Sequence, residues 1–254
     1  MTEEGWQDCG DPTLMLRFQI GTNDVRVQAV EAFSDCKGSD RKLRLFACAC
    51  YGRLSHLLPD PLARAAVKVA ERFADGEAAT GELELADARV RGALNAFEGR
   101  WRASRGAEHM ALLPTHEALA LGLVAVWAEA PKAAYYASSN ASLAFAAIMN
   151  PGDATYDSGF LASRAAEERA QADLLRCIFG NPFRPVAADP KWLTLDAVAL
   201  ARTIYDDKTF DRLLALADAL RDAGCDDESI FAHCRSEGVH ARGCWVVDLV
   251  LGKG

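Results

Sequence analysis

Apolar residues recur at steps of three and four along most of this chain, which is the spacing of one helical face. The segment that begins at Asp40 is the clearest case, and it leaves Arg44 and Arg53 largely outside its apolar face. That face consists of Leu43, Phe46, Ala47, Cys50, Leu54 and Leu57. Pro59 ends the segment, and Asp60–Pro61 begins the next one with a capping residue and a proline at the first helical position. The two segments predict an αα-hairpin.

Further helices are predicted along the rest of the chain. They span residues 80–105, 115–127, 133–149, 160–179, 194–205, 210–223 and 226–235, with Thr115, Thr194 and Asp226 as capping residues. The apolar run Cys244–Leu251 is also predicted to be a helix, with Asp248 exposed to solvent. The sequence has no sustained alternation of apolar and polar residues and no hairpin dipeptide, so we predict an all-α fold.

A cluster of turn-forming residues at Asn150–Gly159 indicates a boundary between two helical parts. We therefore predict a multi-helix, mostly antiparallel bundle with an N-terminal helical lobe at residues 1–150 and a C-terminal lobe at 151–254. A single domain that contains both lobes is the alternative.

Composition and net charge favour a globular protein and disfavour several kinds of partner. Half of the 254 residues are hydrophobic, which suffices for a large core. A net charge of −8 disfavours a nucleic-acid partner, because an acidic surface repels phosphate. The N-terminus lacks the basic and apolar regions of a signal peptide, and the apolar stretch Ala118–Ala128 is shorter than the ~20 residues that span a bilayer. We expect a cytoplasmic protein without a membrane partner.

The cysteines and histidines near the C-terminus are the strongest candidates for chemistry. Five potential zinc ligands occur within a short stretch, namely Cys225, His233, Cys234, His240 and Cys244. Zinc sites usually offer their ligands as close pairs, and no such pair is present. Adjacent residues of a helix also point in different directions, so His233 and Cys234 should not share one ion. We predict no metal ligand here, with the eight cysteines reduced and mostly buried, and keep a zinc site as the alternative.

Other motifs are weaker. Glu237–His240 has the E-x-x-H form of di-iron proteins, which need two such motifs. His56, His109 and His116 could pair with a thiol, but no signature of a nucleophile surrounds them. The basic stretch 89–109 is interrupted by acidic residues, as on a solvated helix face. The chain has no glycine-rich phosphate loop, and we assign no catalytic or cofactor-binding residue.

Three stretches carry a resemblance to a known family. They are Ser39–Cys50, Asp173–Pro185 and a C-terminal block from Phe210 to Lys253 that includes Leu-Ala-Asp-Ala-Leu, His-Cys-Arg and Arg-Gly-Cys-Trp-Val-Val-Asp-Leu. In these stretches the chain resembles an uncharacterised bacterial family that occurs as many related copies in certain large genomes. The resemblance implies a shared fold and expansion by duplication, and it assigns no activity or residue role.

The sequence is rich in apolar residues and has no motif that would bring polar side chains together at one site. This combination is typical of a non-catalytic protein-interaction or scaffold module whose partner is another protein. The alternative is a metal-dependent or hydrolytic enzyme that uses the C-terminal cysteines and histidines.

Overall fold

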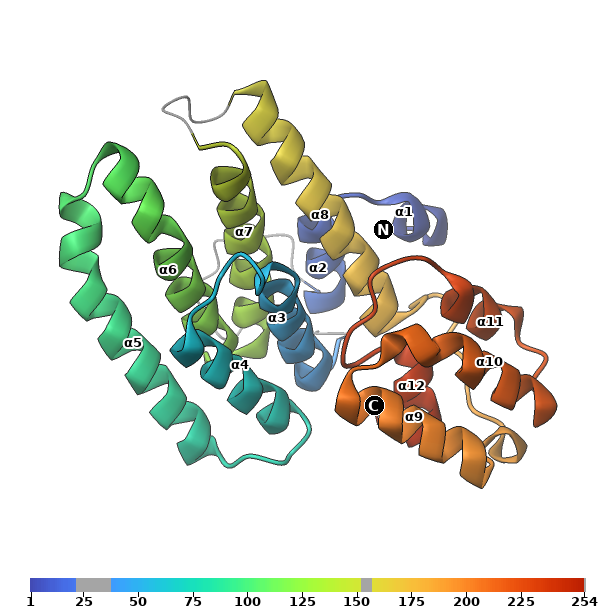
Figure 1. Ribbon diagram of the computed structural model, residues 1–254. Coiled ribbons are helices and arrows are strands. Elements are labelled where there is room, and N and C mark those ends of the chain that lie inside the picture. The colour runs from blue at the N-terminus through green and yellow to red at the C-terminus, as the bar shows by residue number, and fades with distance from the viewer. Residues whose placement is uncertain (22–37, 152–156, 254) are drawn as a thin grey trace. The chain divides into compact units, whose positions relative to one another are not determined.

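The computed structural model describes residues 1–21, 38–151 and 157–253. These residues form α-helices joined by turns and two short 3-10 segments, with no strand among them, which confirms the predicted all-α fold (Figure 1). None of the described helices is both long and apolar enough to cross a membrane.

The chain divides into two compact units. Met1–Asp8 and Asp173–Gly254 form one, here called the C-terminal unit, and Cys9–Ala172 forms the other, here called the inserted unit. The division falls inside the helix α8 (Ser158–Phe179), whereas the boundary predicted from the turn cluster lies before that helix.

The inserted unit consists of α2 (Pro12–Ile20), α3 (Asp40–Leu54), α4 (Pro61–Ala74), α5 (Thr80–Ala103), α6 (Gly106–Ala125), α7 (Ala130–Met149) and the first part of α8. The helix α3 lies at the centre of this unit and packs against α4, α6 and α7. Because α3 has neighbours on several sides, Cys48 and Cys50 are both buried although they point in different directions.

Arg44 of α3 is buried, which corrects the expectation that it lies outside the apolar face. Its guanidinium donates hydrogen bonds to the carbonyl oxygens of Ala125, Trp127 and Ala128, at 3.2, 2.7 and 2.8 Å. The last carbonyls of a helix have no partner within the helix and carry partial negative charge. Arg44 therefore caps the end of α6, a tertiary contact that helical periodicity does not reveal.

A second buried polar network joins three helices of the inserted unit. Arg53 of α3 donates to Glu167 of α8 through Nε at 3.0 Å and Nη2 at 2.9 Å. Gln171, one turn further along α8, donates to Glu167 at 3.2 Å and accepts a 2.6 Å bond from Ser138 of α7. The side chain of Glu167 has no exposed surface. The network therefore ties α3, α7 and α8 together.

Some helix boundaries differ from those predicted. Thr194 caps α9 (Leu195–Asp207) as expected, and its side chain accepts a hydrogen bond from the backbone N–H of Ala197. Asp60 likewise caps α4 and accepts from the backbone N–H of Ala63. Thr115 is not a cap, because α6 begins at Gly106 and continues through Pro114. A proline inside a helix removes one hydrogen bond, and here the buried apolar residues on both sides of it keep the segment helical.

Two glycines make a testable comparison of packing in the inserted unit. A Cβ atom on Gly122 of α6 would lie 2.8 Å from the Cα and Cβ of Ala63 on α4. We expect Gly122→Ala to lower the free energy of unfolding by about 1–3 kcal/mol through overpacking. Gly92 of α5 has open space at this position, so Gly92→Ala should stabilise the protein by about 0.5–1 kcal/mol through helix propensity. Urea unfolding of both variants checks this, and equal stabilisation by the two substitutions would contradict the close approach of α4 and α6.

The C-terminal unit contains α1 (Glu3–Asp8), the end of α8, α9, α10 (Leu213–Asp222), α11 (Glu228–Arg235) and α12 (Trp245–Leu251). Its apolar core gathers residues from α9 to α12 together with Cys177 of α8, Cys225 and Cys244. The N-terminal residues belong to this unit because Trp6 is fully buried and its Nε1 donates to the carbonyl oxygen of Gly180 at 3.0 Å. Arg176 of α8 in turn donates to the carbonyl oxygen of Trp6 at 3.1 Å.

The helix predicted for the run Cys244–Leu251 is present as α12, with Cys244 at its N-cap position, but the expectation that Asp248 is exposed is wrong, because Asp248 is only 1 % exposed. This short helix also buries Val246, Val247 and Val250, so more than one of its faces is covered. Asp248 lies in its first turn, where the free N–H groups of a helix favour negative charge.

Candidate metal centre

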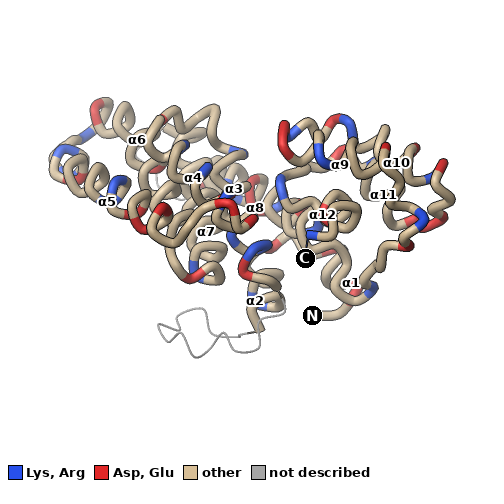
Figure 2. Tube along the Cα trace, turned by 90° about the horizontal axis from the view of Figure 1, so that it is seen from below, with Lys and Arg blue, Asp and Glu red and all other residues tan. Residues whose placement is uncertain are grey.

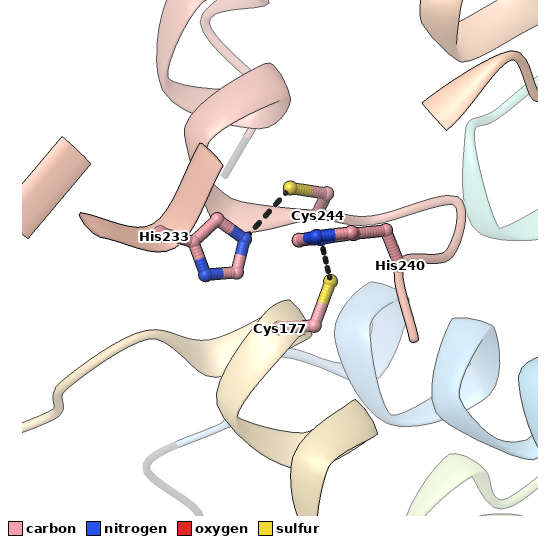
Figure 3. A group of neighbouring side chains, drawn as sticks. All are labelled: Cys177, His233, His240 and Cys244. Atoms are coloured by element: carbon pink, nitrogen blue, oxygen red, sulfur yellow. Dashed lines mark hydrogen bonds between the residues drawn. The ribbon is translucent and has the colours of Figure 1, made fainter. Parts of the chain in front are cut away.

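Four side chains of the C-terminal unit converge on one point (Figure 3). They are Cys177 near the end of α8, His233 in the last turn of α11, His240 in the loop between α11 and α12, and Cys244 at the start of α12. One ligand atom from each residue lies within 4.8 Å of the other three. Both cysteines are buried and both histidines are half-buried. We refer to these four residues as the Cys/His cluster.

Local backbone structure brings the cluster together. Gly180 follows α8 with a φ of 65°, so the helix ends soon after Cys177. Asp227, and not Asp226 as predicted, caps α11 and thereby sets the start of the helix that carries His233. Gly243, with a φ of 92°, turns the chain in front of Cys244 in a conformation that favours glycine.

The spacing of the ligand atoms suits a tetrahedral ion. Nε2 of His233 lies 3.2 Å from Sγ of Cys244, and Nδ1 of His240 lies 3.5 Å from Sγ of Cys177. Zinc bonds of about 2.0–2.1 Å to nitrogen and about 2.3 Å to sulfur place adjacent N and S atoms of a tetrahedron about 3.5–3.6 Å apart. Small shifts of these side chains would therefore allow all four atoms to bind one ion.

The ring of His240 is oriented by a contact outside the cluster. Its Nε2 lies 3.3 Å from the carbonyl oxygen of Ser236 and 3.4 Å from the hydroxyl of the same residue. An N–H group on Nε2 can donate to that carbonyl, which leaves the lone pair of Nδ1 directed at the centre of the cluster. Histidines that bind metals commonly donate their second ring N–H to a carbonyl or carboxylate in this way.

The cluster also has an asymmetric charge distribution. Burial alone would raise the pKa of the Cys244 thiol, but the neighbouring side chains of Cys177, His233 and His240 outweigh burial and hold this pKa well below its ordinary value. The interaction with the sulfur of Cys244, together with burial, raises the pKa of the Cys177 thiol well above its ordinary value. These contacts favour the thiolate at Cys244 over the thiolate at Cys177.

A cleft of about 500 Å³ borders this centre. Three of the four cluster residues line it, all but Cys244, and Arg176, Asn181 and Trp245 are also part of its wall. Trp245 is half-buried, and its ring centroid lies 5.4 Å from that of His233. An ion or a small reagent could therefore reach the cluster from solvent.

The structure brings together three of the five zinc candidates from the sequence, namely His233, His240 and Cys244. Cys225 and Cys234 are buried but are not part of the cluster, and burial raises the pKa of both thiols, that of Cys234 to about 12. The separation of His233 from Cys234 follows the helical geometry that the sequence indicated. Cys177 was missed because it lies 63 residues before His240, although it belongs to one of the three stretches that carry the family resemblance.

The other candidates from the sequence lie elsewhere. Glu237 and His56 are both exposed, and both lie outside the helices. His109 and His116 belong to the inserted unit, and both stack on Trp101, with ring centroids 3.8 and 4.3 Å away.

The arginines of the basic stretch 89–109 are exposed to solvent, on α5 and in the turn that follows it. Arg91 and Arg102 pair with Asp87 and Glu98 one turn before them. Basic and acidic residues are interspersed along α5 (Figure 2). This pattern agrees with the expectation of a charged helix surface.

Comparison of the chain with protein-family models, with curated proteins and with solved structures gives no match.

Proposed function

We propose that the C-terminal unit binds one zinc ion through the Cys/His cluster, and that the chain acts as a non-catalytic helical interaction module that this ion stabilises. The convergence of two sulfur and two imidazole nitrogen atoms within 4.8 Å is the observation that carries the proposal.

The donor set favours zinc among the common metal ions. Two thiolates and two imidazoles in a tetrahedral arrangement are typical of structural zinc, whereas calcium and magnesium prefer oxygen ligands. Two thiolates also balance the charge of Zn²⁺, so the filled centre is neutral. A neutral centre suits a place where both sulfur atoms are buried, because burying an unpaired charge is costly.

Four protein ligands favour a structural role over a catalytic one. Catalytic zinc sites keep one position for water or substrate, and a site with four protein ligands leaves none. The helices α11 and α12 have 8 and 7 residues and are too short to be stable alone. An ion that joins them to α8 would hold the end of the chain in its folded form.

The remaining parts of the proposal rest on the sequence. A protein partner, a cytoplasmic location and a relationship to a multi-copy bacterial family are expectations from composition and from the stretches that resemble that family. A metal-dependent enzyme is the second candidate, since the cleft of about 500 Å³ reaches both histidines of the cluster. Such an enzyme would need one ligand to give way to water on the side of the cleft.

Substitution of cobalt for zinc distinguishes the two candidates. We expect the cobalt protein to show the intense visible bands of tetrahedral Co²⁺ and a thiolate charge-transfer band. Azide or cyanide should leave these bands unchanged, because a closed site has no position for an added anion. A cobalt spectrum that responds to these anions at low concentration would favour the enzyme, and an octahedral spectrum without thiolate bands would reject the cluster as the binding site.

A further inference from the structure

The two cysteines of the cluster come from distant parts of the chain, and their sulfur atoms lie within 4.8 Å of each other. Cys177 lies in the last turn of α8, and Cys244 is the N-cap residue of α12. Both are free thiols in the structure. A disulfide has its sulfur atoms about 2.05 Å apart, so its formation would need them to approach each other by at most about 3 Å.

We propose that Cys177 and Cys244 form a redox-active pair, so that a peroxide converts them to a disulfide and expels the zinc ion. The release of zinc rests on the function proposed above, whereas the formation of the disulfide does not.

The chemistry balances with hydrogen peroxide as the oxidant. One thiolate attacks the peroxide and becomes a sulfenic acid, and hydroxide leaves and takes up a proton to form water. The second thiolate then attacks that sulfur, a disulfide forms, and a second hydroxide leaves and is protonated. The two sulfur atoms lose two electrons, and the O–O bond is broken to give two molecules of water. The disulfide has no thiolate to offer, and two imidazoles alone hold Zn²⁺ weakly.

The cleft explains why this pair should react before the other buried thiols. Cys177 lines the cleft, so a molecule as small as peroxide can approach its sulfur. Cys225 and Cys234 are buried in the same unit, and neither lines the cleft. Cys48 in the inserted unit is buried and directs its thiol to the carbonyl oxygen of Val67.

Oxidation would also change which elements are held together. A disulfide keeps α8 joined to the start of α12, but it releases His233 on α11 and His240 in the following loop. Oxidation would therefore loosen α11 and this loop selectively, on the side of the unit that borders the cleft. Reduction would restore the ligands and allow zinc to bind again.

The test treats the reduced, zinc-loaded protein with a small excess of hydrogen peroxide. A chromophoric chelator records zinc, and mass spectrometry of peptides from the unreduced protein locates the disulfide. We expect one equivalent of zinc to be released per chain, a Cys177–Cys244 disulfide to appear at the same rate, and a thiol reductant to reverse both changes.

Two variants sharpen this result. Cys225→Ser changes a buried thiol of the same unit that is not in the cluster, and it should release zinc at the wild-type rate. In Cys177→Ser the disulfide cannot form, and the reductant-reversible loss of two thiols should disappear. If this variant does not fold, the disulfide map of the wild-type protein decides.

A disulfide between any other pair, or peroxide treatment that leaves Cys177 and Cys244 reduced, would overturn the proposal. If the purified protein contains no zinc, the proposed function fails, and the disulfide map of the metal-free protein still decides whether the two cysteines are a redox pair.

Discussion

Replacing Cys244 with alanine should remove the zinc ion and unfold most of the C-terminal unit. The side chain is fully buried, starts α12 and supplies one of the two thiolates of the cluster. Structural zinc contributes an apparent free energy of about 10–16 kcal/mol at neutral pH, and this binding energy is also folding energy. A domain has a net stability of only about 5–15 kcal/mol, so loss of the ion should exceed what the unit can tolerate.

Cys234→Ala is the matched control for this experiment. Cys234 is a buried cysteine of the same unit that is part of the apolar core and outside the cluster. Its replacement leaves a cavity of roughly one sulfur atom and should cost about 1 kcal/mol without loss of metal. Metal content and thermal unfolding followed by circular dichroism compare the two variants. If both variants keep their metal and melt alike, Cys244 is not a ligand and the metal centre is wrong.

Replacing Glu167 with alanine should have the largest effect on the inserted unit. Glu167 is 1 % exposed and pairs with Arg53, and it also accepts a hydrogen bond from Gln171. Its removal leaves the guanidinium and the amide without their acceptor in the interior. Breaking a buried ion pair by removing one partner typically costs about 3–5 kcal/mol.

The neighbouring residue provides the control. Glu168 pairs with Arg164 one turn earlier on α8, and both side chains are partly exposed, at 28 % and 37 %. Glu168→Ala should therefore cost only about 0.3–0.5 kcal/mol. Hydrogen exchange resolved by peptide would show faster exchange in α3, α7 and α8 for Glu167→Ala and little change for Glu168→Ala. Equal effects of the two substitutions would contradict the role of Glu167 in joining these helices.

Most of the helices could be predicted from the sequence because their signals are local. Asp60–Pro61 starts α4 and Thr194 caps α9, and both signals lie within the first turn that they determine. The sequence wrongly placed Arg44 and Asp248 on the surface, because their burial depends on tertiary packing and not on local sequence. The partners of Arg44 are carbonyl groups more than 80 residues away, so its environment depends on tertiary packing.

The candidate metal centre likewise has one feature that follows from local sequence and others that depend on tertiary packing. Helical geometry correctly separated His233 from its neighbour Cys234. The expectation of close ligand pairs failed to find the cluster, because its ligands come from α8, α11, a loop and the start of α12. Cys177 could be recognised only after folding had brought the end of α8 to the other three side chains.

Metal analysis of the purified protein tests the central proposal most directly. The protein would be prepared under reducing conditions without chelators, and its metal content would be measured by elemental analysis together with the mass of the intact native chain. We predict one zinc ion per chain, lost together with the folded C-terminal unit when a strong chelator is added. A folded C-terminal unit in a chain that contains no metal, and that binds none when zinc is supplied, would contradict the account.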